Sequence, residues 1–206
     1  SITVVKMFPG DGRNELFSRK KFWAHSLACA VISRQLALRM RKFTLFDPEE
    51  CFCAGLIHDI GRVVLDVDFG RVMHIWAGHA GCEPADLAAR FVVNDSFRHH
   101  ETGRIDDAAF FQNLRASLGI QISDVQFLEG WNAIFAGEMP GIAEHLARAA
   151  KRMPLYAFSN INPPHVEHFS KAYAGVLGHF REIFLSSTIG FRKPDLEAYD
   201  LSLIHI

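Results

Sequence analysis

Residues 154–195 read PLYAFSNINPPHVEHFSKAYAGVLGHFREIFLSSTIGFRKPD, and their pattern gives the clearest indication of topology in the chain. Two compact apolar runs, 154–158 and 182–187, are typical of short buried strands. The pattern between them, from about 165 to 180, predicts a helix. Strand, helix and strand in this order form the crossover unit of a parallel sheet. The sequence therefore predicts a piece of α/β structure near the end of the chain.

Upstream of this unit, short helical patterns alternate with helix-breaking residues. Helices are predicted over residues 84–91, 106–118, 123–135 and 141–152, the third with Gln126 at capping-box distance from Ser123. Farther upstream, apolar residues recur at helical spacing over 20–42. The residues Asp47-Pro48-Glu49-Glu50 predict the start of a further helix that runs through Ile60 and stops at Gly61. We therefore expect a mainly α chain with a partial α/β unit.

Composition narrows the class of protein. The 206 residues are 49% hydrophobic and 22% charged, which is typical of a globular chain. Lys and Arg number 22 against 23 Asp and Glu, and this balance argues against binding to nucleic acid. No apolar run approaches the roughly 20 residues that span a bilayer, so we expect no membrane association. Four cysteines without paired spacing favour reduced thiols and a cytoplasmic protein.

A histidine on one predicted helix and a His-Asp pair at the end of the next form the first candidate site. His25 lies near the start of the helix over 20–42, and His58 and Asp59 lie just before Gly61. Imidazole and carboxylate groups can share one divalent metal ion, which lowers the pKa of bound water and creates a hydrolytic nucleophile. In the alternative interpretation, these side chains only join two helices.

These residues lie in a stretch that resembles a known family. FWAHSLACAVISRQLA and DPEECFCAGLIHDIGRVVLD resemble the HD-type helical family, and most closely its HDOD branch, over about residues 14–67. The resemblance places the family's metal-binding residues at His25, His58 and Asp59. HDOD members are mostly regulatory modules without activity, so the resemblance implies a protein partner for this segment. An active HD member would instead be a metal-dependent phosphohydrolase.

Polar residues that follow the two predicted strands form the second candidate site. Ser159 and Asn160 follow the first strand, and Lys193 lies in the loop after the second. Parallel strands end at the same edge of a sheet, where a hydroxyl, backbone amides and a fixed cation can hold a phosphate. The alternative is a capping or turn role for Ser159 and a solvated Lys193.

The second candidate site also lies in stretches that resemble a family. PLYAFSNINPPHVEHF and EIFLSSTIGFRKPDLEAYD closely resemble the second and third motifs of the haloacid dehalogenase (HAD) superfamily, in which the serine and lysine hold the transferred phosphate. DVDFGRVMHIWA, FRHHETGRID and EGWNAIFAGEMPGIAEHL resemble the helical cap of its sugar-phosphatase-like members. The resemblance covers about residues 59–200. It implies a cap, an incomplete Rossmann-like parallel sheet, Mg²⁺ as cofactor and a small phosphorylated substrate such as a sugar phosphate.

Both resemblances use Asp59. The HAD superfamily requires an aspartate nucleophile at the end of its first strand, and Asp59-Ile60-Gly61 is the candidate. That interpretation implies that Asp59 attacks the phosphomonoester, that Asp59 and the Gly61 carbonyl hold Mg²⁺, and that the second candidate site stabilises the phosphoryl oxygens. The HD interpretation needs Asp59 at a helix end, and the helix start at residues 47–50 favours that geometry.

We infer from this conflict that the chain joins two pieces within HDIGRVVLDVDF, residues 58–69. The expected division is an HDOD-like helical segment over 1–61, a HAD-like cap region over 62–152, a partial HAD-like core over 153–200 and a tail over 201–206. The tail LSLIHI is what one reading frame of a common sequencing-library transposon end encodes. We therefore expect the natural protein to continue beyond it and to carry the fourth HAD motif there.

The functional expectation follows from the later motifs. They predict a HAD-like phosphohydrolase that acts through an aspartyl-phosphate intermediate and is incomplete in this chain. The alternatives are an HDOD-like regulatory module without catalysis and an HD-type phosphohydrolase with another divalent metal.

Overall fold

The computed structural model describes residues 60–152 and 154–198. The chain divides into two units, Ser1–Leu56 and Ile57–Ile206, and every described residue lies in the second. The helix predicted over 20–42 lies outside the described residues, and so does the predicted helix that starts at Asp47, apart from its last residue, Ile60, and Gly61.

A tight turn opens the described structure. The backbone amides of Val64 and Leu65 both donate to the carbonyl of Ile60, and Gly61 forms an isolated bridge with Leu65. The sequence predicted that a helix continues through Ile60, but Ile60 lies in a bend. Arg62 takes a positive φ of 62°, which turns the chain directly toward the first strand.

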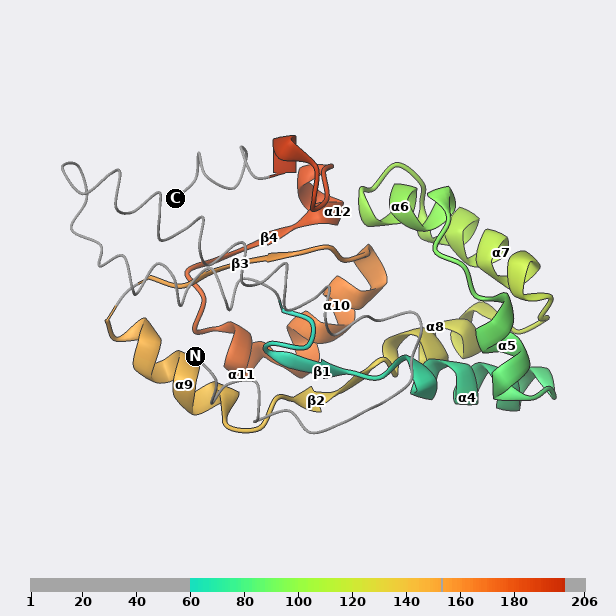
Figure 1. The fold of residues 1–206 in the computed structure, drawn as a ribbon, viewed down its shortest axis with the longest axis horizontal. Helices are drawn as coiled ribbons and strands as arrows, with labels where there is room; N and C mark the ends of the chain where they lie inside the picture. Colours follow the sequence, from blue (N-terminus) through green and yellow to red (C-terminus); the bar gives the residue numbers. More distant parts are fainter. Residues whose placement is uncertain (1–59, 153, 199–206) are drawn as a thin grey trace. The chain divides into compact units, whose positions relative to one another are not determined.

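Two short antiparallel strands, β1 (Leu65–Val67) and β2 (Phe135–Glu138), flank a helical insertion, residues 68–134. Figure 1 shows the helices of this insertion following one another beyond the ends of the two strands. The helices are α4 (Phe69–Ala80), α5 (Pro84–Arg90), α6 (Asp95–Glu101), α7 (Asp107–Leu118) and α8 (Asp124–Asn132).

Local capping signals explain the ends of the predicted helices in the insertion. The Asp106 carboxylate accepts a hydrogen bond from the amide of Ala109 at 2.8 Å and starts α7, which ends at Gly119 with φ 67°. Ser123 and Gln126 form the predicted capping box at the start of α8. The predictions for α5, α7 and α8 are confirmed, although α8 ends at Asn132 and not at residue 135. Sequence patterns did not predict α4 or α6.

The helical insertion has its own hydrophobic cluster. Trp76 and Trp131 stack with ring centroids 5.7 Å apart, and Trp76 also stacks on Phe127 at 4.7 Å. The buried side chains of this cluster are Val72, Met73, Trp76, Ala77, Leu87, Phe91, Phe110, Phe111, Leu114, Leu118, Ile120, Ile122, Phe127 and Trp131.

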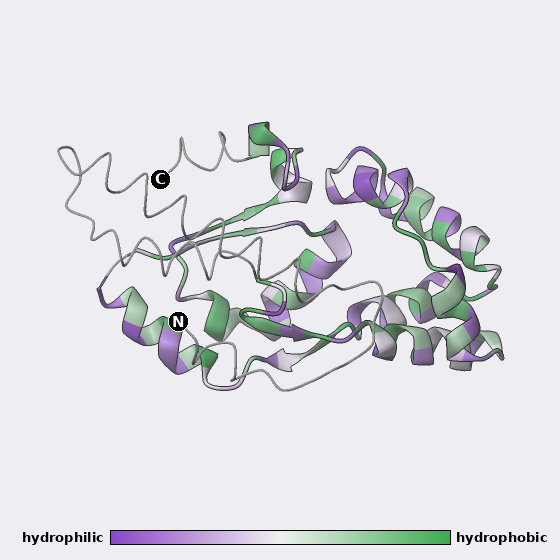
Figure 2. Ribbon diagram, in the orientation of Figure 1, coloured by the Kyte–Doolittle hydropathy of each residue, from purple (hydrophilic) through white to green (hydrophobic). Residues whose placement is uncertain are grey.

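The α/β unit, residues 154–198, contains β3 (Tyr156–Ser159) and β4 (Glu182–Leu185), which pair in parallel as predicted. The crossover contains α10 (Pro163–Ala172) and α11 (Ala174–Leu177), so the predicted helix over 165–180 is broken at Tyr173, where φ is −122°. A short helix, α12 (Ser186–Ile189), follows β4 directly. Figure 2 shows hydrophobic residues along β4, which matches its place in a packed layer.

A second hydrophobic cluster joins the opening turn to the α/β unit. It contains Ile60 and Val64 from the turn, Leu146 from α9 (Ile142–Ala150), and Ala157 and Phe169 from the α/β unit. Ile134 packs against this cluster and against the cluster of the insertion, so the two clusters are continuous at that residue. The described structure is thus mainly helical with a partial α/β unit. None of its helices is both long and apolar enough to cross a membrane.

Candidate functional site

The carboxyl ends of β3 and β4 lie side by side. Ser159, the last residue of β3, pairs in register with Leu185, the last residue of β4, and Ser186 follows at once. Ser159 and Ser186 are both buried. Because the strands are parallel, these residues and the loops that follow them meet at one edge of the sheet.

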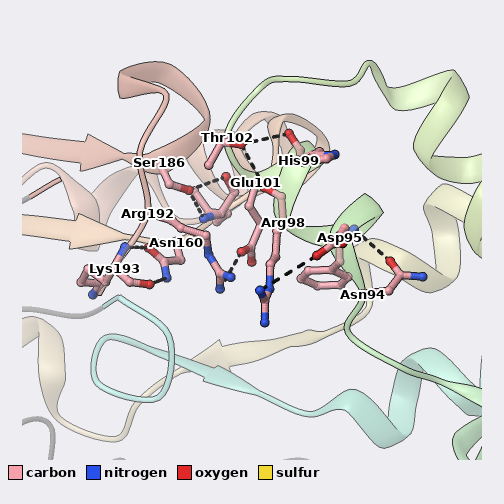
Figure 3. Close-up of polar contacts among 12 residues, drawn as sticks. Asn94, Asp95, Arg98, His99, Glu101, Thr102, Asn160, Ser186, Arg192 and Lys193 are labelled. Carbon is pink, nitrogen blue, oxygen red and sulfur yellow. Dashed lines mark hydrogen bonds and ion pairs between the residues drawn. The ribbon is translucent and has the colours of Figure 1, made fainter. Parts of the chain in front are cut away.

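Asn160 joins the loop after β3 to the loop after α12. Its amide nitrogen donates to the carbonyl of Lys193 at 2.9 Å, and its amide oxygen accepts from the backbone nitrogen of Lys193 at 2.8 Å (Figure 3). The buried Lys193 ammonium donates to the carbonyl of Phe158 at 2.7 Å and lies 5.3 Å from the centre of the Phe158 ring. The structure therefore brings Ser159, Asn160 and Lys193 together, and Lys193 is not solvated.

Ser186 closes the same edge of the sheet. Its hydroxyl accepts a hydrogen bond from the amide of Ile161 at 2.9 Å and lies 3.2 Å from the carbonyl of Ile161, to which it can donate. These contacts hold the loop after β3 against the start of α12. Sequence reasoning did not select Ser186, because the predicted strand ran through residue 187, whereas the observed strand β4 ends at Leu185.

The helical insertion also reaches this edge. Glu101, the last residue of α6, lies with its carboxylate 3.0 Å from the guanidinium of Arg192, which directly precedes Lys193. Figure 3 shows these two side chains pointing toward one another from α6 and from the segment after α12. Sequence analysis missed both residues. The adjacency of Arg192 to Lys193 was a usable signal, but no pattern pointed to Glu101.

A buried polar network links α10 to α8 behind the site. The side-chain oxygen Oδ1 of Asn162 accepts from the backbone amide of His165 at 3.1 Å and from the indole of Trp131 at 3.2 Å. The side-chain nitrogen Nδ2 of Asn162 lies 3.0 Å from Nδ1 of His165, and Nε2 of His165 lies 2.9 Å from the carbonyl of Trp131. A carbonyl only accepts, so Nε2 carries the proton and Nδ1 accepts from Asn162.

The protonation state of His165 follows from this network. Burial lowers the pKa of His165 to about 3 from 6.5, and the hydrogen bond to the Trp131 carbonyl offsets only part of that effect. A second proton would also remove the Nδ1 acceptor that Asn162 uses. His165 is therefore a neutral residue that joins the α/β unit to the insertion, close in sequence to Ser159 and Asn160.

The remaining predicted site residues lie at or beyond the edge of the described structure. His25, His58 and Asp59 lie outside the described residues. Gly61 is half-buried, and a β-carbon there would meet nothing within 4 Å. Within residues 60–152 and 154–198, no group of three or more His, Cys, Asp or Glu side chains could hold a metal ion. The described residues therefore do not form a complete Mg²⁺ site.

Solved structures show which fold this arrangement represents. A HAD family enzyme from Bacteroides thetaiotaomicron, solved in complex with magnesium and inorganic phosphate, matches with a TM-score of 0.61 and 21% sequence identity. The match covers 71% of this chain and 75% of that chain. This chain contains a HAD-like fold. A HAD-like family hydrolase from Porphyromonas gingivalis matches at a TM-score of 0.57 and 17% identity, covering 71% of this chain and 72% of that chain.

The beginning of the chain matches a different family. The model of the HDOD domain matches residues 1–74. The HAD-like match covers 71% of this chain. The residues after position 74 make up a smaller share of the 206 residues, so the HAD-like match must include some residues that also match the HDOD domain. Both resemblances seen in the sequence are thus confirmed. The solved structures confirm the fold of the HAD-like part, with its helical cap and incomplete parallel sheet. The family model confirms the HDOD-like segment from its sequence.

Proposed function

We propose that the HAD-like part of this chain binds a small phosphomonoester at the edge formed by β3 and β4 and hydrolyses it. The observation that carries the proposal is the convergence of Ser159 and Asn160, at the end of β3, with Lys193, in the loop after α12. A hydroxyl and an ammonium at the ends of parallel strands are suited to hold a phosphoryl group. The match to an enzyme solved with inorganic phosphate supports the same substrate class.

Each residue has a distinct part in the proposed reaction. The Ser159 hydroxyl and the Lys193 ammonium bind the phosphoryl oxygens and stabilise the charge that develops on them. Asn160 is a positioning residue, since its two hydrogen bonds hold the backbone of Lys193. Asp59 is the proposed nucleophile: its carboxylate oxygen forms a bond to phosphorus as the ester oxygen leaves, and water then cleaves the aspartyl phosphate. Ile60, which follows Asp59 in the chain, is buried in one cluster with Ala157 and Ile161.

Phosphate release from small phosphomonoesters tests this function. We expect release that depends on Mg²⁺, because Mg²⁺ is the cofactor proposed to bind Asp59 and the Gly61 carbonyl. Asp59→Asn and Lys193→Met should each abolish release. The matched control is Lys171→Met, which removes an exposed lysine whose ammonium pairs with Glu167 at 2.7 Å. Release that survives Asp59→Asn would contradict the proposed nucleophile.

A second function is favoured by the HDOD match to residues 1–74. In this candidate the segment over 1–61 is a regulatory module that binds a protein partner and catalyses nothing. A third arrangement, an HD-type phosphohydrolase, would bind manganese or iron at His25, His58 and Asp59. Loss of activity on His25→Ala, together with metal bound in the wild type, would favour the HD centre, whereas activity that survives His25→Ala supports the HAD-like function.

The domain boundaries and the location in the cell belong to the same proposal. We propose the division 1–61, 62–152, 153–200 and 201–206, with the join of the two pieces within residues 58–69. A cytoplasmic location rests on the interpretation that the cysteines are reduced, and Cys82, the cysteine within the described residues, is a free thiol.

A further inference from the structure

The Ser186 hydroxyl pairs with both backbone groups of one buried residue. The register of the two parallel strands ends with Ser159 opposite Leu185. Just beyond this end, the hydroxyl accepts from the amide of Ile161 at 2.9 Å and donates to the carbonyl of the same residue at 3.2 Å. Buried backbone groups need such partners. The hydroxyl therefore continues the connection between the two strand ends where the backbone pairing stops.

Both residues of this contact are fixed in place. Ser186 is fully buried and begins α12, and its own carbonyl accepts from the amide of Gly190 at 3.0 Å. The Ile161 side chain is buried in the second hydrophobic cluster. Ile161 and Ser186 thus form a fixed point at the edge of the sheet.

Asn160 connects this fixed point to Lys193. It lies between Ser159 and Ile161 in the chain, and its side-chain amide forms two hydrogen bonds with the backbone of Lys193, at 2.9 and 2.8 Å (Figure 3). The Lys193 ammonium reaches back to the carbonyl of Phe158 at 2.7 Å. A displacement of the Ile161 backbone would therefore move the adjacent Asn160 and, through it, Lys193.

We propose that Ser186 is a positioning residue for the phosphate site, which acts on Lys193 through Ile161 and Asn160. The inference rests on the proposed function, because it assigns a further residue to the same site. Without the hydroxyl, two buried backbone groups of Ile161 lose this partner, and since unpaired buried groups are costly, the loop shifts toward other partners. Such a shift separates Ser159 from Lys193, and a displacement of about 1 Å is enough to weaken a site of this kind.

Calorimetry with inorganic phosphate tests this role. Ser186→Ala should weaken phosphate binding about tenfold, because the hydroxyl makes two buried contacts. Ser186→Cys places a thiol of similar size there, which hydrogen-bonds only weakly, so it should weaken binding about threefold. The cysteine variant decides the question if the alanine variant does not fold. Phosphate affinity within about twofold of the wild type in these variants overturns the inference.

Ser123→Ala is the matched control. It also removes a serine hydroxyl that accepts from a backbone amide, that of Gln126 at 3.3 Å, but at the start of α8 in the insertion. This variant should lose stability and leave the phosphate affinity of the folded protein unchanged. An equal loss of affinity in Ser123→Ala and Ser186→Ala would trace the effect to general destabilisation and overturn the positioning role.

A double variant tests the route through Asn160. Two independent tenfold effects multiply to about a hundredfold, whereas effects that act along one chain of contacts do not. Because Ser186 acts through Asn160, the combination of Ser186→Ala with Asn160→Ala should bind phosphate about tenfold more weakly than the wild type, as Asn160→Ala does alone. A loss of about a hundredfold would overturn this route.

Backbone amide NMR signals separate failure of this inference from failure of the proposed function. If the wild type binds no phosphate, the proposed function fails, and the spectra alone decide whether Ser186 positions Lys193. Ser186→Ala should shift the amide proton signal of Ile161 upfield, because that amide loses its hydrogen bond, and should also shift the amide signal of Lys193. Ser123→Ala should move neither signal. A Lys193 amide signal that is unchanged in Ser186→Ala overturns the inference.

Discussion

Replacing Gly130 with alanine tests the contact that holds α8 against α4. A β-carbon at Gly130 would overlap Cδ1 of the Trp76 ring and would lie 2.5 Å from its Nε1. The ring has nowhere to move, because it is fully buried between Phe127 and Trp131. Its Nε1 also donates to the carbonyl of Phe127 at 2.9 Å.

The expected loss in the free energy of unfolding follows from the packing and the hydrogen bond that the Trp76 ring would lose. Overpacking a core costs about 1–3 kcal/mol, and displacing the indole also weakens a buried hydrogen bond, so we expect a cost of about 2–4 kcal/mol. Alanine favours a helix over glycine by about 1 kcal/mol and offsets part of this. The net loss in the free energy of unfolding should therefore be about 1–3 kcal/mol.

Gly78→Ala is the matched control, because Gly78 lies in α4 and a β-carbon there would meet nothing within 4 Å. It should raise the free energy of unfolding by about 0.5–1 kcal/mol. Urea unfolding followed by tryptophan fluorescence measures both variants, and hydrogen exchange of the α4 and α8 amides locates the effect. A Gly130→Ala variant as stable as the wild type would refute the reasoning, and equal destabilisation by both variants would exclude Trp76 as its cause.

Three further predictions concern protonation, positioning and capping. Because burial lowers the pKa of His165 to about 3 in the folded protein from 6.5 in the unfolded chain, the unfolded chain binds the extra proton between these values, and stability falls as the pH falls from about 6.5 toward 3. His165→Gln should flatten this fall, measured by urea unfolding across pH, by up to about 1.4 kcal/mol per pH unit, and an unchanged slope would contradict a buried neutral histidine. Asn160→Ala should weaken binding of inorganic phosphate about tenfold in calorimetry, since Lys193 loses two backbone contacts; unchanged affinity would exclude the positioning role. Ser123→Ala should lower the free energy of unfolding in urea by about 1 kcal/mol. Ser117 makes no capping hydrogen bond, so Ser117→Ala should lower it by less than about 0.5 kcal/mol, and similar losses in the two variants would contradict the capping box.

Elements with strong local signals were predictable from sequence. The helix starts at Asp106 and Ser123 depend on side chains that bond to amides three residues away, and such contacts are encoded within a few positions. The parallel pairing of β3 and β4 was predictable because strand, helix and strand in one short segment allow one usual topology. The grouping of Ser159, Asn160 and Lys193 followed from that topology.

Elements that depend on distant pairing were not predictable. In the β1–β2 pair, Leu65 lies opposite Glu138, with the whole helical insertion between them in sequence. Each strand is only three or four residues long, so neither shows a periodic pattern by itself. The helix predicted over 123–135 ran too far for the same reason, because Phe135 is taken up by its pairing with Val67.

Local sequence was sufficient to select Ser159, Asn160 and Lys193 as the residues proposed to bind phosphate, since hydroxyls and cations after strands are recognisable wherever they occur. The tertiary arrangement was needed for Glu101 and Arg192, because a carboxylate at the end of α6 acquires its partner only when that end lies against α12. Propensity acts over a few residues, whereas that contact joins the end of α6 to the segment after α12, which are far apart in the sequence.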